Sequence, residues 1–191
     1  MNLVEALLDR TAQAQVTERG TILGWLAAAW GLVGVSALLL RALSRLTPVA
    51  IEGLGSPSLG PWHWVAAAVW LVAMAYFEGY KGFQRGFAPR VVVRALHLVR
   101  HPQPLHVLLA PLFCMGLIHA RKRRLITSWI VVAGVVTLVF AVGLLAQPWR
   151  GLVDAGVVVG LAWGLAAIVG YAVRALTGRP PQMSADLPAK N

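Results

Sequence analysis

Four long apolar stretches limit what this chain can fold into more than any other feature. A helix needs about 20 apolar residues to cross the roughly 30 Å hydrocarbon core of a bilayer, and stretches of about that length run from about Thr21 to Leu40, Pro61 to Phe77, Leu125 to Ala146 and Leu152 to Val173. The composition agrees, with 58% hydrophobic and 13% charged residues, whereas soluble proteins have about 45–50% and about 25%. These values exclude a soluble enzyme and a disordered chain, and a single Cys excludes an internal disulfide. The sequence therefore predicts an all-α fold, a polytopic integral membrane helical bundle.

The bundle is expected within residues 21–176, flanked by two segments of different character. Its helices are predicted at about 21–42, 61–80, 104–120, 125–146 and 152–175. Residues 1–20 carry acidic residues, unlike a signal peptide, and Leu3, Leu7 and Leu8 share one helical face, so we expect an interfacial helix there. Residues 177–191 are polar and contain two adjacent prolines, and we expect this tail to be disordered.

The number of crossings depends on the short third stretch, Pro104–Ala120, which contains two prolines and two histidines. Lys and Arg of short loops remain on the cytoplasmic side. With five crossings the 17 basic residues divide 8 to 9 between the two sides, and with four they divide 14 to 3. The charge pattern favours four full transmembrane helices plus a short re-entrant segment, with both termini cytoplasmic. A repeat of Ala-Trp-Gly-Leu at residues 29–32 and 162–165 favours a fifth crossing instead.

The block from Tyr76 to Arg100 is the most unusual part of the sequence. Its first half alternates aromatic residues and glycines with Glu78, Lys81 and Arg85. On a helix Glu78 and Lys81, three residues apart, would pair on one face. A carboxylate at the membrane edge could serve proton or ion movement. The alternative, an interfacial anchor of aromatic residues with a local ion pair, is favoured because the block follows the end of an apolar stretch.

A basic amphipathic helix is predicted at 89–101, where Arg90, Arg94 and Arg100 recur at helical spacing. Such a helix is suited to lie on an anionic leaflet. A second basic run, Arg121, Lys122, Arg123 and Arg124, follows the third stretch. Both runs are predicted to bind anionic lipid headgroups. Nucleic-acid binding is not expected, because the positive charges flank membrane segments and no recognition module is present.

The last apolar stretch carries one acid and a regular row of glycines. Arg150 and Asp154 stand four residues apart, so an intrahelical ion pair explains both, with a role in transport as the alternative. Gly156, Gly160 and Gly164 form a stripe that allows another helix to approach closely. The stripe is expected to pack inside the bundle, and a homo-oligomer contact is the alternative.

No cofactor or metal site is predicted. His106 and His119 are thirteen residues apart on one short segment, and no spacing typical of metal ligands is present. Patterns of nucleophiles and nucleotide-binding loops are also absent, so an enzyme is not favoured.

The resulting hypothesis is a small multi-pass membrane protein of structural or accessory type. Its basic cytoplasmic face would bind anionic lipid or a membrane-protein partner. The preponderance of Arg over Lys suggests the inner membrane of a bacterium. The alternative is a small ion- or proton-coupled transporter or channel that uses Glu78, Lys81 or Asp154.

Overall fold

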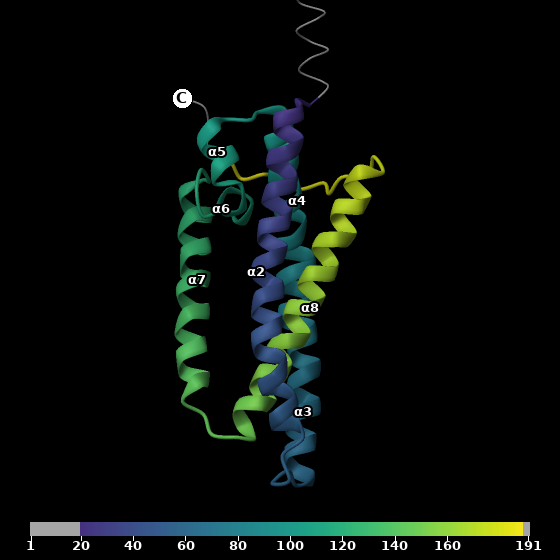
Figure 1. Ribbon diagram of the computed structural model, residues 1–191, viewed down its shortest axis with the longest axis vertical. Helices are drawn as coiled ribbons and strands as arrows, with labels where there is room; N and C mark the ends of the chain where they lie inside the picture. The colour runs from purple at the N-terminus through teal and green to yellow at the C-terminus, as the bar shows by residue number, and fades with distance from the viewer. Residues whose placement is uncertain (1–19, 189–191) are drawn as a thin grey trace, which may run out of the picture.

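The computed structural model describes residues 20–188 of the chain, and every regular element in that range is a helix. Four long helical rods extend along the length of the molecule (Figure 1). They are α2 (Ile22–Leu54), the continuous series α3 (Pro61–Met74), η1 (Ala75–Phe87) and α4 (Ala88–Arg100), then α7 (Lys122–Gly143) and α8 (Trp149–Leu176). α8 is inclined to the others, and α7 is set apart at one side. Two short helices, α5 (Pro104–Leu108) and α6 (Ala110–Met115), lie at one end. The N-terminal helix predicted at 1–20 lies outside the described residues.

Of residues 20–188, three helices are long and apolar enough to cross a membrane: α2, α7 and α8. Both α7 and α8 begin within three residues of their predicted starts and end within three residues of their predicted ends. α2 is longer than expected, since it continues through Pro48 to Leu54 instead of ending near residue 42. Thr21 caps its first turn by accepting a hydrogen bond from the Gly24 amide at 3.0 Å.

The second rod differs most from the prediction. Met74, Ala75, Phe87 and Ala88 all have right-handed helical dihedrals, so the helix does not break where one segment passes into the next. The middle segment, η1, is a π-helix of 13 residues. The residues predicted as a basic amphipathic helix, 89–101, therefore form the end of this rod, continuous with η1. One of its faces is buried, with Ala88, Val91, Ala95 and Leu98 at most 1% exposed.

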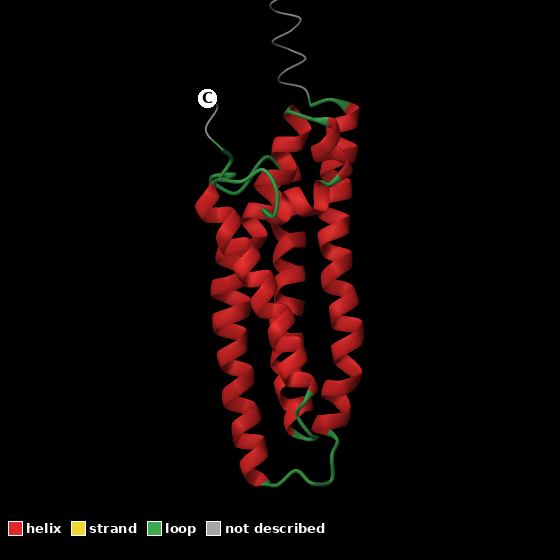
Figure 2. Ribbon diagram, turned by 90° about the vertical axis from the view of Figure 1, so that its left-hand side faces the viewer, coloured by secondary structure: helices red, strands yellow, loops and turns green. Residues whose placement is uncertain are grey.

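The short third stretch reverses direction at one end of the bundle and forms no long helix. α5 and α6 together span only residues 104–115, and Gly116 ends α6 with a φ of 76°. This left-handed conformation suits glycine, which has no Cβ to clash with the backbone. We call residues 104–121 the end cap. Figure 2 shows the loops of the chain gathered at the two ends of the bundle.

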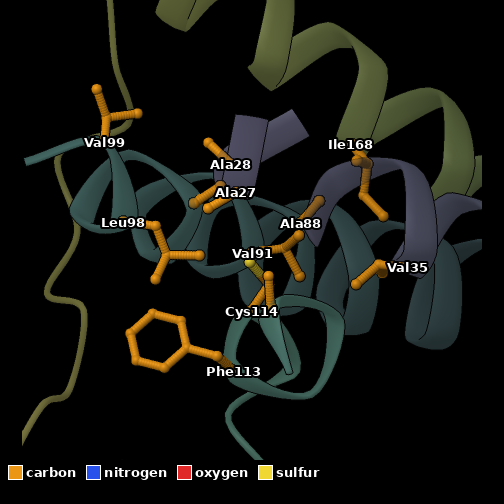
Figure 3. Close-up of a cluster of buried hydrophobic side chains, with 12 residues drawn as sticks. Ala27, Ala28, Val35, Ala88, Val91, Leu98, Val99, Phe113, Cys114 and Ile168 are labelled. Carbon is orange, nitrogen blue, oxygen red and sulfur yellow. The ribbon is translucent and has the colours of Figure 1, made fainter. Parts of the chain in front are cut away.

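Small side chains allow the helices to pack closely in the core. The buried cluster joins α2, α4, α6 and α8 through residues such as Ala27, Ala88, Phe113 and Ile168 (Figure 3). At the other end of the bundle α2 and α8 cross at Gly53 and Gly151, where a Cβ on Gly151 would lie 2.4 Å from the Gly53 Cα. By contrast, α7 buries only Ser128 and Val142.

Candidate functional site

Basic residues collect at the end of the bundle where α4 ends, α7 begins and α8 ends, which we call the basic end (upper end of Figure 1). It carries the exposed or half-buried cations Arg90, Arg100, Arg121, Lys122, Arg123, Arg124, Arg174 and Arg179. The connections at the opposite end, residues 55–60 and 144–148, contain no charged residue. The fold thus brings the two predicted lipid-binding runs, 89–101 and 121–124, to one end of the molecule.

Arg94 departs from the surface position that we expected for a lipid-binding residue, because it is only 2% exposed. Its guanidinium donates hydrogen bonds to the carbonyls of Phe113, Ile118 (2.9 Å), His119 (3.1 Å) and Ala185 (2.7 Å). The group also lies 4.2 Å from the centre of the Phe113 ring. Four of the five N–H donors of the guanidinium are therefore satisfied by backbone oxygens. Arg94 thus joins α4 to α6, to the loop after α6 and to the C-terminal segment.

The described part of the C-terminal tail, residues 177–188, contacts the basic end, whereas we expected 177–191 to be disordered, and residues 189–191 lie outside the described residues. We call residues 184–187 the strap. The backbone amide of Arg121 donates to the Asp186 carbonyl at 2.9 Å, and the Arg121 Nε donates to the Leu187 carbonyl at 3.2 Å. The Asp186 carboxylate lies 3.7 Å from the Arg90 Nε. Leu187 packs against the buried cluster, so an apolar contact also holds the strap in place.

Three histidine rings, those of His97, His106 and His119, lie around Phe113 of the end cap, an arrangement that the sequence spacing did not reveal. The reversal at Gly116 brings the rings of His106 and His119 to 4.4 Å between centroids, although we expected them at the two ends of one helix. The His97 and His101 rings stack at 4.7 Å. Burial lowers the pKa of His106, and His119 and Arg94 lower it further. Among residues 20–188 no group of three or more His, Cys, Asp or Glu side chains could hold a metal ion.

Glu78 and Lys81 do not pair as predicted. Lys81 lies 4.9 Å from the Tyr76 ring centre and 5.4 Å from that of Phe77, in cation–π contacts. The π-helix explains this, because i→i+5 bonding widens the turn and moves residues three apart onto different faces. Arg85 contacts Tyr80, five residues earlier, in the same way.

Glu78 lies against α8 in the middle of the second rod and not at the end of a helix. A Cβ on Gly160 would lie 2.8 Å from its Oε2 atom. In the described part of the chain the Glu78 carboxylate makes no hydrogen bond or ion pair with a side chain. The interpretation of Glu78 as part of an interfacial anchor required a helix end near water. Because the rod continues past Glu78, this requirement is not met.

Asp154 is 5% exposed, and its carboxylate lies 4.0 Å from the Arg150 Nε, in the ion pair predicted from their spacing. Asp154 is six residues from Gly160, where Glu78 packs, so about 9 Å of helix rise separates the two positions on α8. In a bundle of four crossings whose second helix ended near Glu78, these two acids would lie at opposite membrane faces. The fold places them about two turns apart along one helix interface, because the second rod continues past Glu78.

The glycine stripe of α8 packs inside the molecule. Gly156 receives Trp70 and Met74, Gly160 receives Glu78, and Gly164 receives Phe83. The neighbouring Trp163 packs on Gly79 and donates a 2.7 Å hydrogen bond to Gln84. The stripe therefore packs inside the bundle, and side chains of the same chain fill the space over its glycines.

The sequence does contain an indication that Arg94 is buried. Arg94 lies between the basic positions 90, 97 and 101 and the apolar positions 87, 91 and 98 on the helical wheel. The basic spacing alone assigned it to the solvated face.

Comparison of the chain with protein-family models, with curated proteins and with solved structures gave no match.

Proposed function

We propose that this chain is a small multi-pass membrane protein of structural or accessory type whose basic end faces the cytoplasm and binds anionic lipid headgroups. The observation that carries the proposal is the unequal charge of the two ends: basic residues from three helices meet at one, and the connecting loops at the other are uncharged. Lys and Arg flanking membrane segments remain on the cytoplasmic side, and each contributes about 1 kcal/mol near an anionic surface.

The proposed topology has four crossings and both termini in the cytoplasm. Three of the crossings are the long apolar helices α2, α7 and α8. The fourth is the rod of α3, η1 and α4, which also extends along the length of the molecule and has an apolar first half (Figure 1). The end cap would lie at the cytoplasmic interface. An excess of Arg over Lys supports a bacterial inner membrane as the location.

Cysteine accessibility tests the topology. Single cysteines at Arg123 and at Ser58, in a chain whose Cys114 is replaced by Ala, are labelled with a membrane-impermeant maleimide in sealed cells. Labelling of Ser58→Cys and protection of Arg123→Cys is expected. The reverse result contradicts the orientation, and labelling of both positions contradicts the proposed number of crossings.

Native mass spectrometry tests lipid binding by the full-length protein. We expect retention of phosphatidylglycerol in preference to phosphatidylcholine, and loss of that preference when Arg121 and Arg123 are both replaced by Gln. The matched control replaces Arg41 and Arg45, which are also exposed but lie in the half of α2 that is farther from the basic end. Equal retention of the two lipids by the unaltered chain would contradict the proposal.

The second candidate function is proton- or ion-coupled transport through Glu78, and the position of Glu78 inside the bundle favours this function. An ionisable side chain inside a helix bundle is costly and commonly functional, and π-helical segments are frequent at functional sites. Glu78 meets both descriptions, with Lys81 and Asp154 as the nearest candidates to assist it. Proteoliposomes loaded with a pH-sensitive dye should lose proton flux on Glu78→Gln and keep it on Glu52→Gln. Absence of flux from the unaltered protein would remove this candidate.

A further inference from the structure

Arginines of the basic end lie near the single carboxylate of the strap, and Arg90 is the one at ion-pair distance from it. The Asp186 carboxylate is 3.7 Å from the Arg90 Nε, and its charge also interacts with those of Arg94 and Arg124. The positive charges of Arg90 and Arg124 repel each other. One negative charge thus faces three positive ones, so the group as described attracts a further or a more highly charged anion.

Asp186 is a weak partner for these arginines. Charge-assisted hydrogen bonds between nitrogen and oxygen measure about 2.7–2.9 Å, and the Arg90–Asp186 distance of 3.7 Å is much longer. The Arg90 Nε atom is buried and has no hydrogen-bond partner. A buried donor without an acceptor destabilises the folded state. An anion that is free to approach to hydrogen-bond distance could satisfy this donor.

The backbone holds the carboxylate in place. The Ala185 carbonyl accepts a hydrogen bond from Arg94, and the Asp186 and Leu187 carbonyls accept from Arg121. Asp186 has a φ of 50°, a left-handed conformation that is uncommon for residues other than glycine. Its side chain is 29% exposed, so the carboxylate can be reached from outside the protein.

We propose that the strap is a built-in competitor for a phosphate site formed by Arg90 and Arg124, with Arg94 adding positive charge, and that the phosphate of an anionic lipid headgroup displaces Asp186 from it. This inference rests on the proposed function, whose binding site it locates and whose regulation it describes. A phosphate diester carries one negative charge on two oxygens, as a carboxylate does, but it is not held by the strap backbone and can approach the paired donors of arginine to hydrogen-bond distance. Free phosphate has the same chemistry and is the other possible source.

The strap proposal is tested with the full-length protein in phosphatidylcholine nanodiscs that contain increasing fractions of phosphatidylglycerol. Asp186→Asn removes the competing charge and keeps the backbone contacts, so we expect about fivefold tighter binding of phosphatidylglycerol, which corresponds to about 1 kcal/mol. Asp186→Glu should bind like the unaltered chain. Arg90→Gln should weaken binding about fivefold. Glu52→Gln, the same change of charge in the other half of the bundle, should have no effect.

A second readout follows the strap itself. Ser184→Cys, in a chain with Cys114 replaced by Ala, should react faster with a soluble maleimide when phosphatidylglycerol is added. If inorganic phosphate added to neutral nanodiscs accelerates the reaction equally, the lipid source is wrong. If Asp186→Asn binds phosphatidylglycerol like the unaltered chain, the competitor role is wrong although the proposed function stands. If no variant prefers phosphatidylglycerol, the proposed function itself fails.

Discussion

The two last helices, α7 and α8, have similar composition and opposite surroundings. Their mean hydropathies over an 18-residue window are 2.5 and 2.1, yet 11% of that window is buried in α7 and 39% in α8. α8 has glycines that receive Trp70, Glu78 and Phe83, whereas Gly134 and Gly143 of α7 have nothing within 4 Å. Apolar character therefore does not decide which helix packs into the bundle. In a membrane the lipid is as apolar as a leucine side chain, and small residues that let helices approach decide instead.

The largest expected effect comes from filling a glycine of α8. Gly151→Leu places a side chain where the Gly53 backbone stands 2.4 Å from the new Cβ, and a backbone cannot move aside as a side chain does. Overpacking of this kind costs about 3 kcal/mol or more, which corresponds to a Tm lower by about 6–12 °C for a chain of this size. The same change on α7, Gly134→Leu, is the control and should leave Tm within about 2 °C. Equal losses in both variants would contradict the contrast between the helices.

The second prediction concerns the end cap, from which α7 starts. Arg94→Met keeps much of the volume of the side chain and leaves four backbone carbonyls without their donor. Unsatisfied buried groups of this kind cost about 1–3 kcal/mol each before relaxation, and we expect a net loss of about 2–3 kcal/mol, measured as a Tm lower by about 4–12 °C in detergent. Arg123→Met is the exposed control. Unchanged stability of Arg94→Met would mean that the guanidinium does not hold the cap together.

The sequence predicted those helices that end where their apolar runs end. α7 and α8 are predicted to within three residues because a long apolar run forms the body of each helix, and each begins three residues early because the basic residues 122–124 and 150 belong to its first turn. The second rod could not be predicted in the same way. The glycines of η1 are typical of a bend, but the helix continues along α8, where Gly79 packs on Trp163 and Gly160 and Gly164 receive Glu78 and Phe83.

The candidate site was predicted in part, for a similar reason. Basic spacing identified the residues of the basic end, but it placed Arg94 on the surface, because the spacing of cations does not show what the opposite face contacts. The convergence of His106 and His119 depends on one left-handed glycine, Gly116, between them. The docked strap depends on carbonyls of residues 185–187, which have no side-chain signal in the sequence.

A smaller effect is expected where α7 meets the end cap. The Trp129 Nε1 donates a 3.2 Å hydrogen bond to the Leu117 carbonyl. Trp129→Phe removes this bond and should cost about 1 kcal/mol, read as a Tm lower by about 2–4 °C. The matched variant on the packed side is Trp70→Phe, since the Trp70 Nε1 donates to the Val153 carbonyl of α8 at 3.2 Å. Trp70 also fills the space over Gly156, so its replacement should cost more. A larger loss for Trp129→Phe would reverse the ranking of the two helices.

The smallest effect distinguishes the end cap from the helices by pH. The pKa of His106 is lowered from its ordinary value of 6.5 by burial, and by His119 and Arg94 beside it. The unfolded chain therefore takes up a proton on this residue at a higher pH than the folded chain does. Above about pH 7 the residue is neutral in both states and contributes nothing, and stability is lost as the pH falls below 6.5.

The difference in Tm between the unaltered chain and His106→Gln should change between pH 7.5 and 5, with the unaltered chain losing more on acidification. Parallel curves for the two chains would show that protonation of His106 is not linked to folding. The pH would then no longer distinguish the end cap, where His106 lies, from α7, which contains no histidine.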